Sequence, residues 1–345
     1  MPHPHRVRDI AEQAGLSEAT VDRVLHGRRG ASARAVRAVE QAVLDLDRQQ
    51  SQLRLAARNL IIDVIIQAPA RFSSAVREAL EAELRGTRPA AVRARFDLRE
   101  QADVEAAVAA LDGVGRGGRV SHGIILKAPD EPEVAAAVQR VAARGIPVVT
   151  LVTDVRGSGR AAYVGLDNAA AGQTAAYLVT CWLHRPATIL VTMSRSTFLG
   201  ERERVEAFLG AVRQLDPALG TFVITETDGL EASLAALVAD ALDRDPEIAA
   251  VYSVGGGNRA IARQFEKAGR RSEVFIAHDL DADNVELLRA GVVSAVLHHE
   301  LRTDLRRALH QLLRAHGLLP GAPTSIAANV EVVTPYSIPP RLAPH

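Results

Sequence analysis

Cysteine is almost absent from this chain of 345 residues, in which Cys181 stands alone. A single cysteine cannot form an intrachain disulfide, so we expect a reducing compartment. Lysine is also scarce, since Lys127 and Lys267 are the two lysines among 41 basic residues. We interpret this preference for arginine as a bias of the source rather than as a functional feature.

Long apolar runs are absent as well. The N-terminal stretch MPHPHRVRDIAEQAG is polar and has no signal-peptide core, and no apolar run is long enough to span a membrane. These absences predict a cytoplasmic protein without a membrane segment.

The motifs of common catalytic and metal sites are missing too. The sequence contains no nucleophile elbow, no dinucleotide-binding glycine fingerprint, no H-E-x-x-H and no zinc-spaced set of cysteine and histidine. We therefore expect no catalytic residue, no cofactor and no metal. The HHE triplet at 298–300 does not change this, because neighbouring strand residues point to opposite faces. We assign His299 to a ligand pocket and His298 to a structural role.

Charge is balanced overall, with 41 basic and 41 acidic residues, but it is unevenly distributed. Residues 1–60 carry ten arginines against seven acids. A basic head on a near-neutral body predicts a local anionic partner.

The segment 6–47 has the apolar spacing of three short helices. Gly15 interrupts the first, and Ser17 can cap a second helix over 18–25. A helix-turn-helix needs a small residue, a turn and an apolar anchor, and Ala11, Gly15 and Val21 supply them in that order. A three-helix cap packed on the body fits these positions equally well. In a helix-turn-helix, the start of the second helix faces the major groove. The expected DNA contacts from the head are Arg8, Ser17, Glu18, Ala19, Thr20, Arg23, Arg28 and Arg29.

The stretch VRDIAEQAGLSEATVDRVLHGRRGASARAVRAVEQAV strongly resembles the head of the lac-repressor (LacI/GalR) family, whose pattern reads V-x-D-I/V-A-x-x-A-G-V/L-S-x-x-T-V-S-R-V-L-N-G. The resemblance implies a transcriptional regulator, typically a repressor, that binds a palindromic operator as a homodimer. Within it, Arg23 is expected to pair with guanine and Ala19 to meet a thymine methyl.

Two residues depart from the family pattern. Asp22 stands where the family usually has serine, and His26 where it usually has asparagine. An acid at position 22 weakens phosphate binding unless it pairs with Arg23 or Arg28.

Residues 48–60 are polar at their start and are interpreted as a hinge or linker. In the LacI/GalR family a hinge helix follows a Pro-Asn pair and inserts a leucine into the minor groove. Here Gln50 and Ser51 replace that pair, and Leu55 is our choice for the wedge, with Leu53 and Leu60 as alternatives. A linker packed on the body explains these leucines equally well.

From residue 61 onward, ten short β-rich runs alternate with amphipathic helices. This alternation predicts parallel sheets covered on both faces. Ten strands are many for one sheet, so we expect an α/β fold of two doubly wound lobes behind the helix-turn-helix head at 1–47. We place the N-lobe at about 61–165 and 297–325, and the C-lobe at about 166–296 and 326–345.

The body resembles the type I periplasmic-binding-protein fold in GIPVVTLVTDVRGSGRAAYVGLDNAAAGQTAAYLV, RERVEAFLGAV, VYSVGGGNRAI and VFIAHDLDADN. The resemblance implies a ligand bound between the lobes, and in open parallel sheets ligands bind beyond the carboxyl ends of the strands. Polar groups around an aromatic platform suit a neutral, hydroxyl-rich effector such as a sugar or polyol. The expected ligand residues are Arg71, Phe72, Thr153, Asp154, Arg204, Asn258, Asp279 and His299.

Several of these residues have a second interpretation. Asp279 either accepts ligand hydroxyls or caps the next helix, and Arg204 either binds the ligand or is an exposed helix charge. Sugar-binding relatives usually carry aspartate at the position of Val152.

Two other functions remain open at this point: a transport solute-binding protein, which the basic head and the polar N-terminus oppose, and an α/β enzyme with a helical accessory domain.

Overall fold

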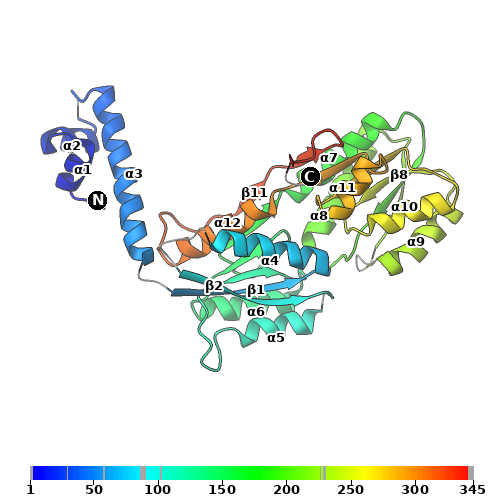
Figure 1. The fold of residues 1–345 in the computed structure, drawn as a ribbon, viewed down its shortest axis with the longest axis horizontal. Coiled ribbons are helices and arrows are strands. Elements are labelled where there is room, and N and C mark those ends of the chain that lie inside the picture. The colour runs from blue at the N-terminus through cyan, green and yellow to red at the C-terminus, as the bar shows by residue number, and fades with distance from the viewer. Residues whose placement is uncertain are drawn as a thin grey trace.

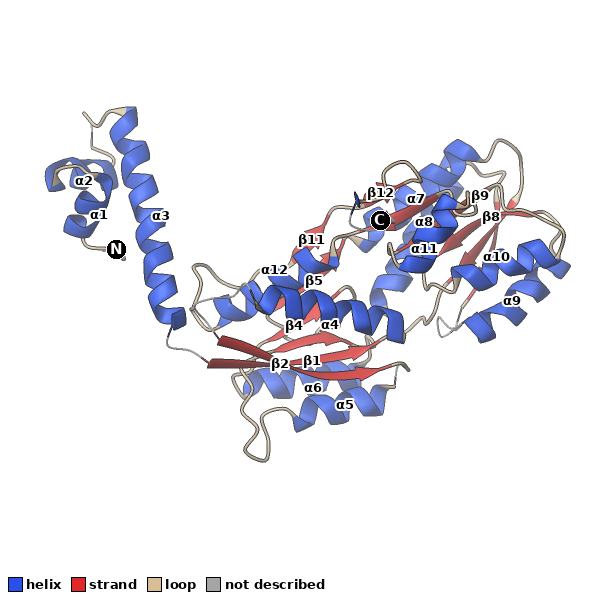
Figure 2. Cartoon of the chain, in the orientation of Figure 1, coloured by secondary structure: helices blue, strands red, loops and turns tan. Residues whose placement is uncertain are grey.

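The computed structural model describes residues 3–28, 30–56, 59–85, 91–101, 103–225, 227 and 231–340. A small helical unit at the N-terminus is followed by two α/β lobes, each a sheet with helices packed on it (Figures 1 and 2). Within the described residues, no helix is long and apolar enough to cross a membrane.

Three helices form the N-terminal unit: α1 (Val7–Ala14), α2 (Glu18–Leu25) and α3 (Ala33–Ala56). Gly15 ends α1 with a φ of 64°, a conformation that a residue without Cβ adopts freely. α3 contains 24 residues and runs through most of 48–60, so the third helix is longer than the sequence suggested. Figure 1 shows α1 and α2 beside the half of α3 that is farther from the lobes. One apolar cluster joins the three helices, with Ile10, Ala11, Val21, Val39 and Ala42 buried in it.

The first lobe is built on a six-stranded sheet in the order β11-β5-β4-β3-β1-β2, all parallel among the described residues. Its central strands are buried almost throughout, as expected for a parallel sheet covered on both faces. Helices α4 and α12 pack on one face and α5 and α6 on the other. The strands are β1 (Asn59–Gln67), β2 (Ala91–Arg99), β3 (Ile124–Lys127), β4 (Val148–Leu151), β5 (Ala162–Leu166) and β11 (Ile326–Ala328). The helices are α4 (Ala70–Leu84), α5 (Val104–Gly113), α6 (Pro132–Ala143) and α12 (Leu301–Ala315).

The second lobe repeats this plan in the order β12-β10-β9-β8-β6-β7, with β12 antiparallel to β10. Helices α7 and α8 pack on one face, and α9, α10 and α11 on the other. The strands are β6 (Thr188–Thr192), β7 (Gly220–Ile224), β8 (Ile248–Ser253), β9 (Val274–His278), β10 (Ala295–His298) and β12 (Glu331–Val333). The helices are α7 (Asn168–Trp182), α8 (Leu199–Leu215), α9 (Glu231–Arg244), α10 (Asn258–Lys267) and α11 (Ala282–Arg289).

In the described part of the chain, the polypeptide crosses between the two sheets three times: from β5 to α7, from β10 to α12, and from β11 to β12. The last crossing follows residue 328 rather than 325, because Ile326–Ala328 pairs with β5 in the first sheet. The two-lobed parallel fold predicted from the sequence is confirmed. Crossings of this kind leave the strand ends of both sheets facing a common cleft.

Candidate functional site

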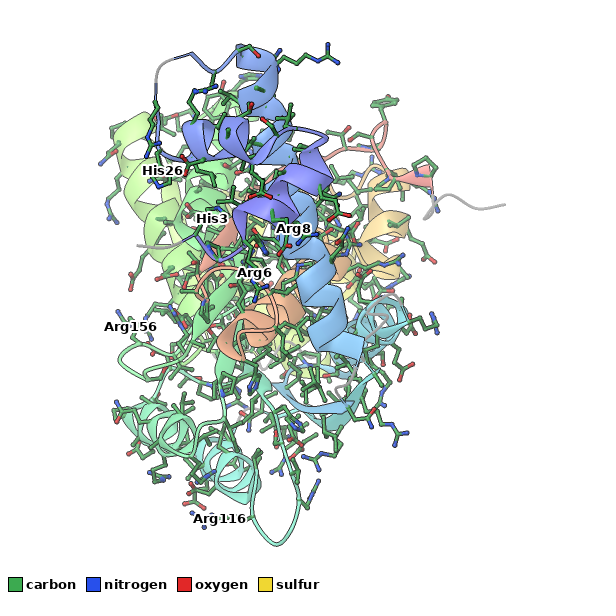
Figure 3. All side chains as sticks on the ribbon, turned by 90° about the vertical axis from the view of Figure 1, so that its left-hand side faces the viewer. His3, Arg6, Arg8, His26, Arg116 and Arg156 are labelled. Atoms are coloured by element: carbon green, nitrogen blue, oxygen red, sulfur yellow. The ribbon has the colours of Figure 1, made fainter. Side chains whose placement is uncertain are left out.

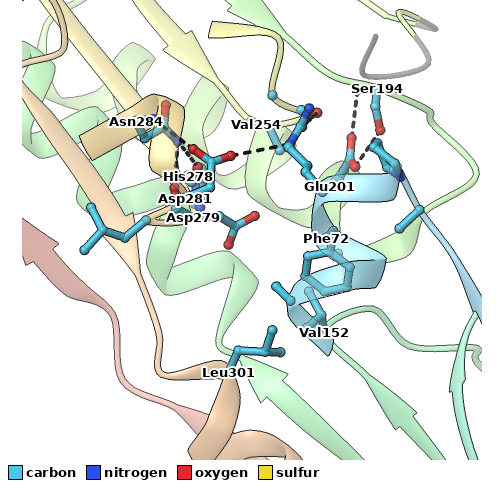
Figure 4. A pocket seen from close by; sticks show the side chains of 18 of the residues that line it. Phe72, Val152, Ser194, Glu201, Val254, His278, Asp279, Asp281, Asn284 and Leu301 are labelled. Atoms are coloured by element: carbon cyan, nitrogen blue, oxygen red, sulfur yellow. Dashed lines mark hydrogen bonds and ion pairs between the residues drawn. The ribbon is translucent and has the colours of Figure 1, made fainter. Parts of the chain in front are cut away.

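A cavity of about 510 Å³ lies between the two lobes, at the carboxyl ends of their strands. The first lobe contributes Phe72 and Lys127, and the second contributes Asn258 and Asp279, among others. Figure 4 shows Asp279 and Phe72 approaching this space from opposite sides, with Glu201 on the side of Phe72. Its volume falls within the range typical of small-molecule sites.

Seven of the eight ligand residues expected from the sequence line this cavity: Arg71, Phe72, Thr153, Arg204, Asn258, Asp279 and His299. Asp154 does not. Its carboxylate is bound by Arg160 and accepts a hydrogen bond from Thr150 Oγ1 at 2.7 Å. The expectation for Asp154 is therefore corrected, because a residue in the following loop neutralises it outside the cavity.

Lys127 is a cavity residue that the sequence analysis missed. It ends β3, is buried, and donates a hydrogen bond from Nζ to the Gln67 carbonyl at 3.2 Å. The ammonium also lies 3.8 Å from the centroid of the Phe198 ring. Burial lowers its pKa to about 8, although the nearby carboxylates of Glu201 and Asp279 oppose that shift. The sequence did hold a signal for this residue, since lysine is scarce in the chain and one of the two lysines stands at a strand end.

Arg204 is buried, which rejects the alternative of an exposed helix charge. It donates from Nε to Asn168 Oδ1 at 2.8 Å, between α8 and the start of α7. The two helices approach closely at Gly172, where a Cβ would lie 2.1 Å from the Arg204 carbonyl oxygen. The guanidinium is therefore held at the cavity wall by the packing of α7 on α8.

Thr153 lies at the end of β4, where Oγ1 accepts a hydrogen bond from the Gly200 amide at 3.0 Å. The preceding Val152 has a φ of 66°, which is rare for a β-branched residue. Its carbonyl accepts from the Tyr163 hydroxyl at 3.2 Å. Val152 gives the cavity an apolar wall at this point.

Asp279 does not cap the helix that follows it. Asp281 is the N-cap of α11 and accepts a hydrogen bond from the Asn284 amide at 2.8 Å. Burial raises the pKa of Asp281. The Asp279 backbone has a φ of 64°, and its carbonyl accepts from Asn284 Nδ2 at 2.6 Å. This local geometry leaves the Asp279 side chain 44% exposed, with its carboxylate directed into the cavity (Figure 4).

Three histidines line the second-lobe side of the cavity. His278 is fully buried, with Nε2 2.9 Å from the Tyr252 hydroxyl, and burial lowers its pKa well below the usual range. His298 accepts at Nδ1 from the Leu280 amide at 3.3 Å, and burial lowers its pKa too. His299 places Nδ1 2.5 Å from Asp304 Oδ2, and both side chains are buried. Of these histidines, His298 accepts a hydrogen bond from a backbone amide and also lines the cavity.

Several buried polar atoms around the cavity have no hydrogen-bond partner among the described residues: Asn258 Oδ1, His278 Nδ1 and His298 Nε2. Buried polar groups are nearly always paired in folded proteins, so such atoms mark positions suited to a polar ligand. Asn258 stands at the start of α10 and donates from Nδ2 to Asn284 Oδ1 at 2.7 Å, which leaves its carbonyl oxygen as the unsatisfied acceptor.

Arg71 reaches from α4 of the first lobe to loops of the second. Its Nε lies 3.4 Å from Asp281 Oδ2, and Nη2 donates to the Gly255 carbonyl at 3.4 Å. Gly256 has a φ of 91°, which favours glycine, and a Cβ there would lie 1.8 Å from Nη2 and would displace the Arg71 guanidinium. The lobes therefore touch across the cavity mouth.

The N-terminal unit presents a second candidate surface. Ser17 caps α2 and accepts from the Thr20 amide at 3.3 Å, and the start of that helix is exposed. Figure 3 shows Arg8 and His26 on this unit. Of the expected DNA contacts, Arg8, Ser17, Glu18, Ala19 and Arg28 are exposed, and Thr20 and Arg23 are half-buried. Arg29 and the side chain of Leu55 lie outside the described part of the chain.

The two departures from the LacI/GalR pattern contact each other. His26 Nδ1 lies 3.0 Å from Asp22 Oδ1, and Arg28 Nη1 lies 2.9 Å from Asp22 Oδ2. Asp22 thus pairs with Arg28, one of the two partners considered from the sequence.

Comparison with known proteins agrees with this architecture. Among solved structures, a glucose-galactose binding protein from Geobacillus stearothermophilus matches with a TM-score of 0.73 and 20% identity, over 82% of this chain and 99% of that chain. A solute-binding protein from Burkholderia graminis in complex with D-arabinose matches with a TM-score of 0.72 and 21% identity, over 80% and 95%. A carbohydrate transporter protein from Acidothermus cellulolyticus in complex with myo-inositol gives 0.68 and 19%, over 81% and 95%. At these identities the likeness shows the fold.

No curated protein matches the chain. The family model described as a periplasmic binding protein domain matches residues 62–303, which excludes the N-terminal unit. Because this match spans more than two thirds of the sequence and both lobes, the chain belongs to the periplasmic binding protein domain family.

Proposed function

We propose that the chain is a ligand-responsive DNA-binding transcriptional regulator, acting as a repressor in the cytoplasm. In this proposal the N-terminal unit is a LacI/GalR-type helix-turn-helix, and the cavity binds a sugar or related polyol. One observation carries the proposal: α2, capped by Ser17 and exposed at its start, stands on the same chain as a two-lobed ligand-binding body.

The geometry of the N-terminal unit supports DNA reading. Gly15 and the Ser17 cap turn α2 against α1, and Val21 anchors α2 in the apolar cluster. This orientation presents Ala19 and Arg23 on a helix of the size that enters a major groove. We assign the phosphate contacts on either side of this helix to Arg8, which is exposed, and Thr20, which is half-buried. The pairing of Asp22 with Arg28 reduces the repulsion of Asp22 from the DNA backbone.

The body supports control by a ligand. Cavity residues come from both lobes, and Arg71 joins them across the mouth, so ligand affinity depends on how the lobes are closed. A ligand alters DNA binding only if it stabilises one closure state over the other. In a homodimer, such a change moves two heads relative to each other and thereby alters their fit to two half-sites of an operator.

The test is to incubate the purified full chain with fragmented genomic DNA of its source and to sequence the retained fragments. We expect enriched fragments that share a pseudo-palindromic sequence, and we expect Arg23→Ala to lose this enrichment. Recovery of random fragments by both proteins, with equal salt dependence, contradicts sequence-specific binding.

A second function is favoured by the solved structures, which are solute-binding and sugar-binding proteins. In that case the chain delivers a sugar to a transporter, and the N-terminal unit has another role. Ligand binding without any enriched DNA fragment is the outcome that selects this function.

A further inference from the structure

The chemistry of the cavity wall around His299 narrows the class of ligand. The His299 ring nitrogen Nδ1 lies 2.5 Å from the Asp304 carboxylate. A carboxylate accepts hydrogen bonds and does not donate them, so Nδ1 carries the hydrogen. In the neutral ring, Nε2 is therefore an acceptor.

Asp304 belongs to α12 and is itself held, since Arg307 Nη1 lies 3.3 Å from its other oxygen. Both the His299 and the Asp304 side chains are almost completely buried, at 3% and 1% exposure. Asp304 therefore fixes both the tautomer and the orientation of the ring, as carboxylates do behind histidines in metal and catalytic sites.

The free acceptor of His299 lies next to a second acceptor. Its Nε2 is 3.9 Å from Asp279 Oδ1, too far for a direct hydrogen bond. Both residues line the cavity, and no described residue donates a hydrogen bond to either atom. Two hydroxyl groups on neighbouring carbons of a ligand can donate one hydrogen bond to His299 Nε2 and one to Asp279 Oδ1.

A donor approaches from the opposite lobe. Lys127 brings its ammonium to the cavity, where one hydrogen is used by the Gln67 carbonyl. A hydroxyl accepts from such a donor while it donates to an acceptor, because it has one hydrogen and two lone pairs. A carboxylate cannot do both: it has no hydrogen for His299 or Asp279, and it adds negative charge beside Asp279 and Glu201.

We propose that His299, oriented by Asp304, and Asp279 form a paired acceptor site that selects neutral ligands with two adjacent hydroxyl groups and rejects the corresponding acids. This inference rests on the proposed function in that the cavity is the sensor site. Asp304 is a positioning residue, because it acts through His299.

The test uses calorimetry of the full chain with named probes: D-glucose, D-galactose, D-arabinose and myo-inositol, against D-glucuronate and D-galacturonate. We expect at least one neutral probe to bind, and both uronates to bind at least about tenfold more weakly than that probe. Asp279→Asn should reduce this selectivity about tenfold, because it removes the repelling charge. No binding of any neutral probe at millimolar concentration, or tighter binding of the acids, overturns the proposal.

Testing the role of Asp304 requires a measurement that a general loss of structure would not change, and the tautomer of His299 is such a measurement. Asp304→Asn keeps the shape but allows the amide to donate to Nδ1, which turns Nε2 into a donor. We expect about tenfold weaker binding of the neutral probe and a switched tautomer in the histidine ¹⁵N spectrum. His299→Gln, which retains an acceptor, should bind more tightly than His299→Ala. An unchanged tautomer in Asp304→Asn, or a doubly protonated His299 ring in the free wild type, refutes the positioning role.

A matched control is Asp112→Asn, which removes a carboxylate bound by Arg140 at 3.0 Å and 2.8 Å outside the cavity. It should leave probe binding and the His299 spectrum unchanged. None of these measurements involves DNA, so failure of the ligand class and failure of the regulatory function are separable. If the probes bind with the expected selectivity but no operator is found, the proposed ligand class stands and the regulatory function is rejected.

Discussion

Replacing Lys127 by methionine should stabilise the protein at pH 7 while weakening its ligand binding. Burial lowers the pKa of Lys127 from 10.5 to about 8. At about 1.4 kcal/mol per pH unit, this difference means that holding the charged ammonium in the fold costs about 3 kcal/mol. Contact with the Phe198 ring returns about 1 to 2 kcal/mol. Methionine fills a similar volume without a charge but loses the hydrogen bond to the Gln67 carbonyl, worth about 1 kcal/mol, so we expect a net gain of up to about 1 kcal/mol.

The pH dependence identifies the cause of that gain. The folded pKa lies below the unfolded one, so the unfolded chain holds more protons between about pH 8 and pH 10.5, and wild-type stability rises through this window. The advantage of Lys127→Met should therefore be largest below about pH 8 and vanish above pH 10.5.

Urea unfolding of the wild type and Lys127→Met at several pH values measures the difference in their free energies of unfolding. Calorimetry with the neutral probe that binds the wild type measures the loss of ligand affinity. A variant that is less stable than wild type at pH 7 refutes the reasoning, because Lys127 then stabilises the fold and is not retained for the ligand.

Four further predictions concern the DNA surface, the cavity and the helix packing. Arg23→Ala should remove specific operator binding but leave weak, salt-sensitive binding, as gel shifts on specific and random duplexes will show. Asp279→Ala should weaken the calorimetrically measured ligand affinity at least about tenfold and leave ligand-free DNA binding intact; unchanged affinity excludes it from the site. Gly172→Ala should lower stability by about 1 to 3 kcal/mol in urea, because its Cβ would meet the Arg204 backbone at 2.1 Å; wild-type stability contradicts that contact. Leu55→Ala should abolish operator bending in circular-permutation gels without lowering the melting temperature, whereas an unbent wild-type complex rejects the wedge.

The lobes were predictable from the sequence because parallel strands buried on both faces read as short apolar runs. The ten runs between residues 61 and 299 correspond to β1 through β10. β11 and β12 escaped notice because each has three residues and is partly exposed, so neither forms an apolar run. The length of α3 was missed for a related reason: its second half is too polar to show an apolar face.

The position of the cavity was predictable from the sequence, but not its full lining. Strand ends are readable from the sequence, and they supplied Asn258, Asp279 and His299. The exclusion of Asp154 depends on Arg160, which a loop brings back to it, and loop conformation is not encoded in periodicity. Lys127 was overlooked because its scarcity was attributed to composition rather than to its position.

The central claim is that a molecule in the cavity controls DNA binding by the same chain. Fluorescence anisotropy on an operator selected from genomic DNA, with and without the neutral sugar or polyol that binds the cavity, tests it most directly. We predict a change in operator affinity of at least about fivefold, which corresponds to about 1 kcal/mol of coupling, and loss of this change in Asp279→Ala. A ligand that occupies the cavity in calorimetry yet leaves operator affinity unchanged would contradict the account.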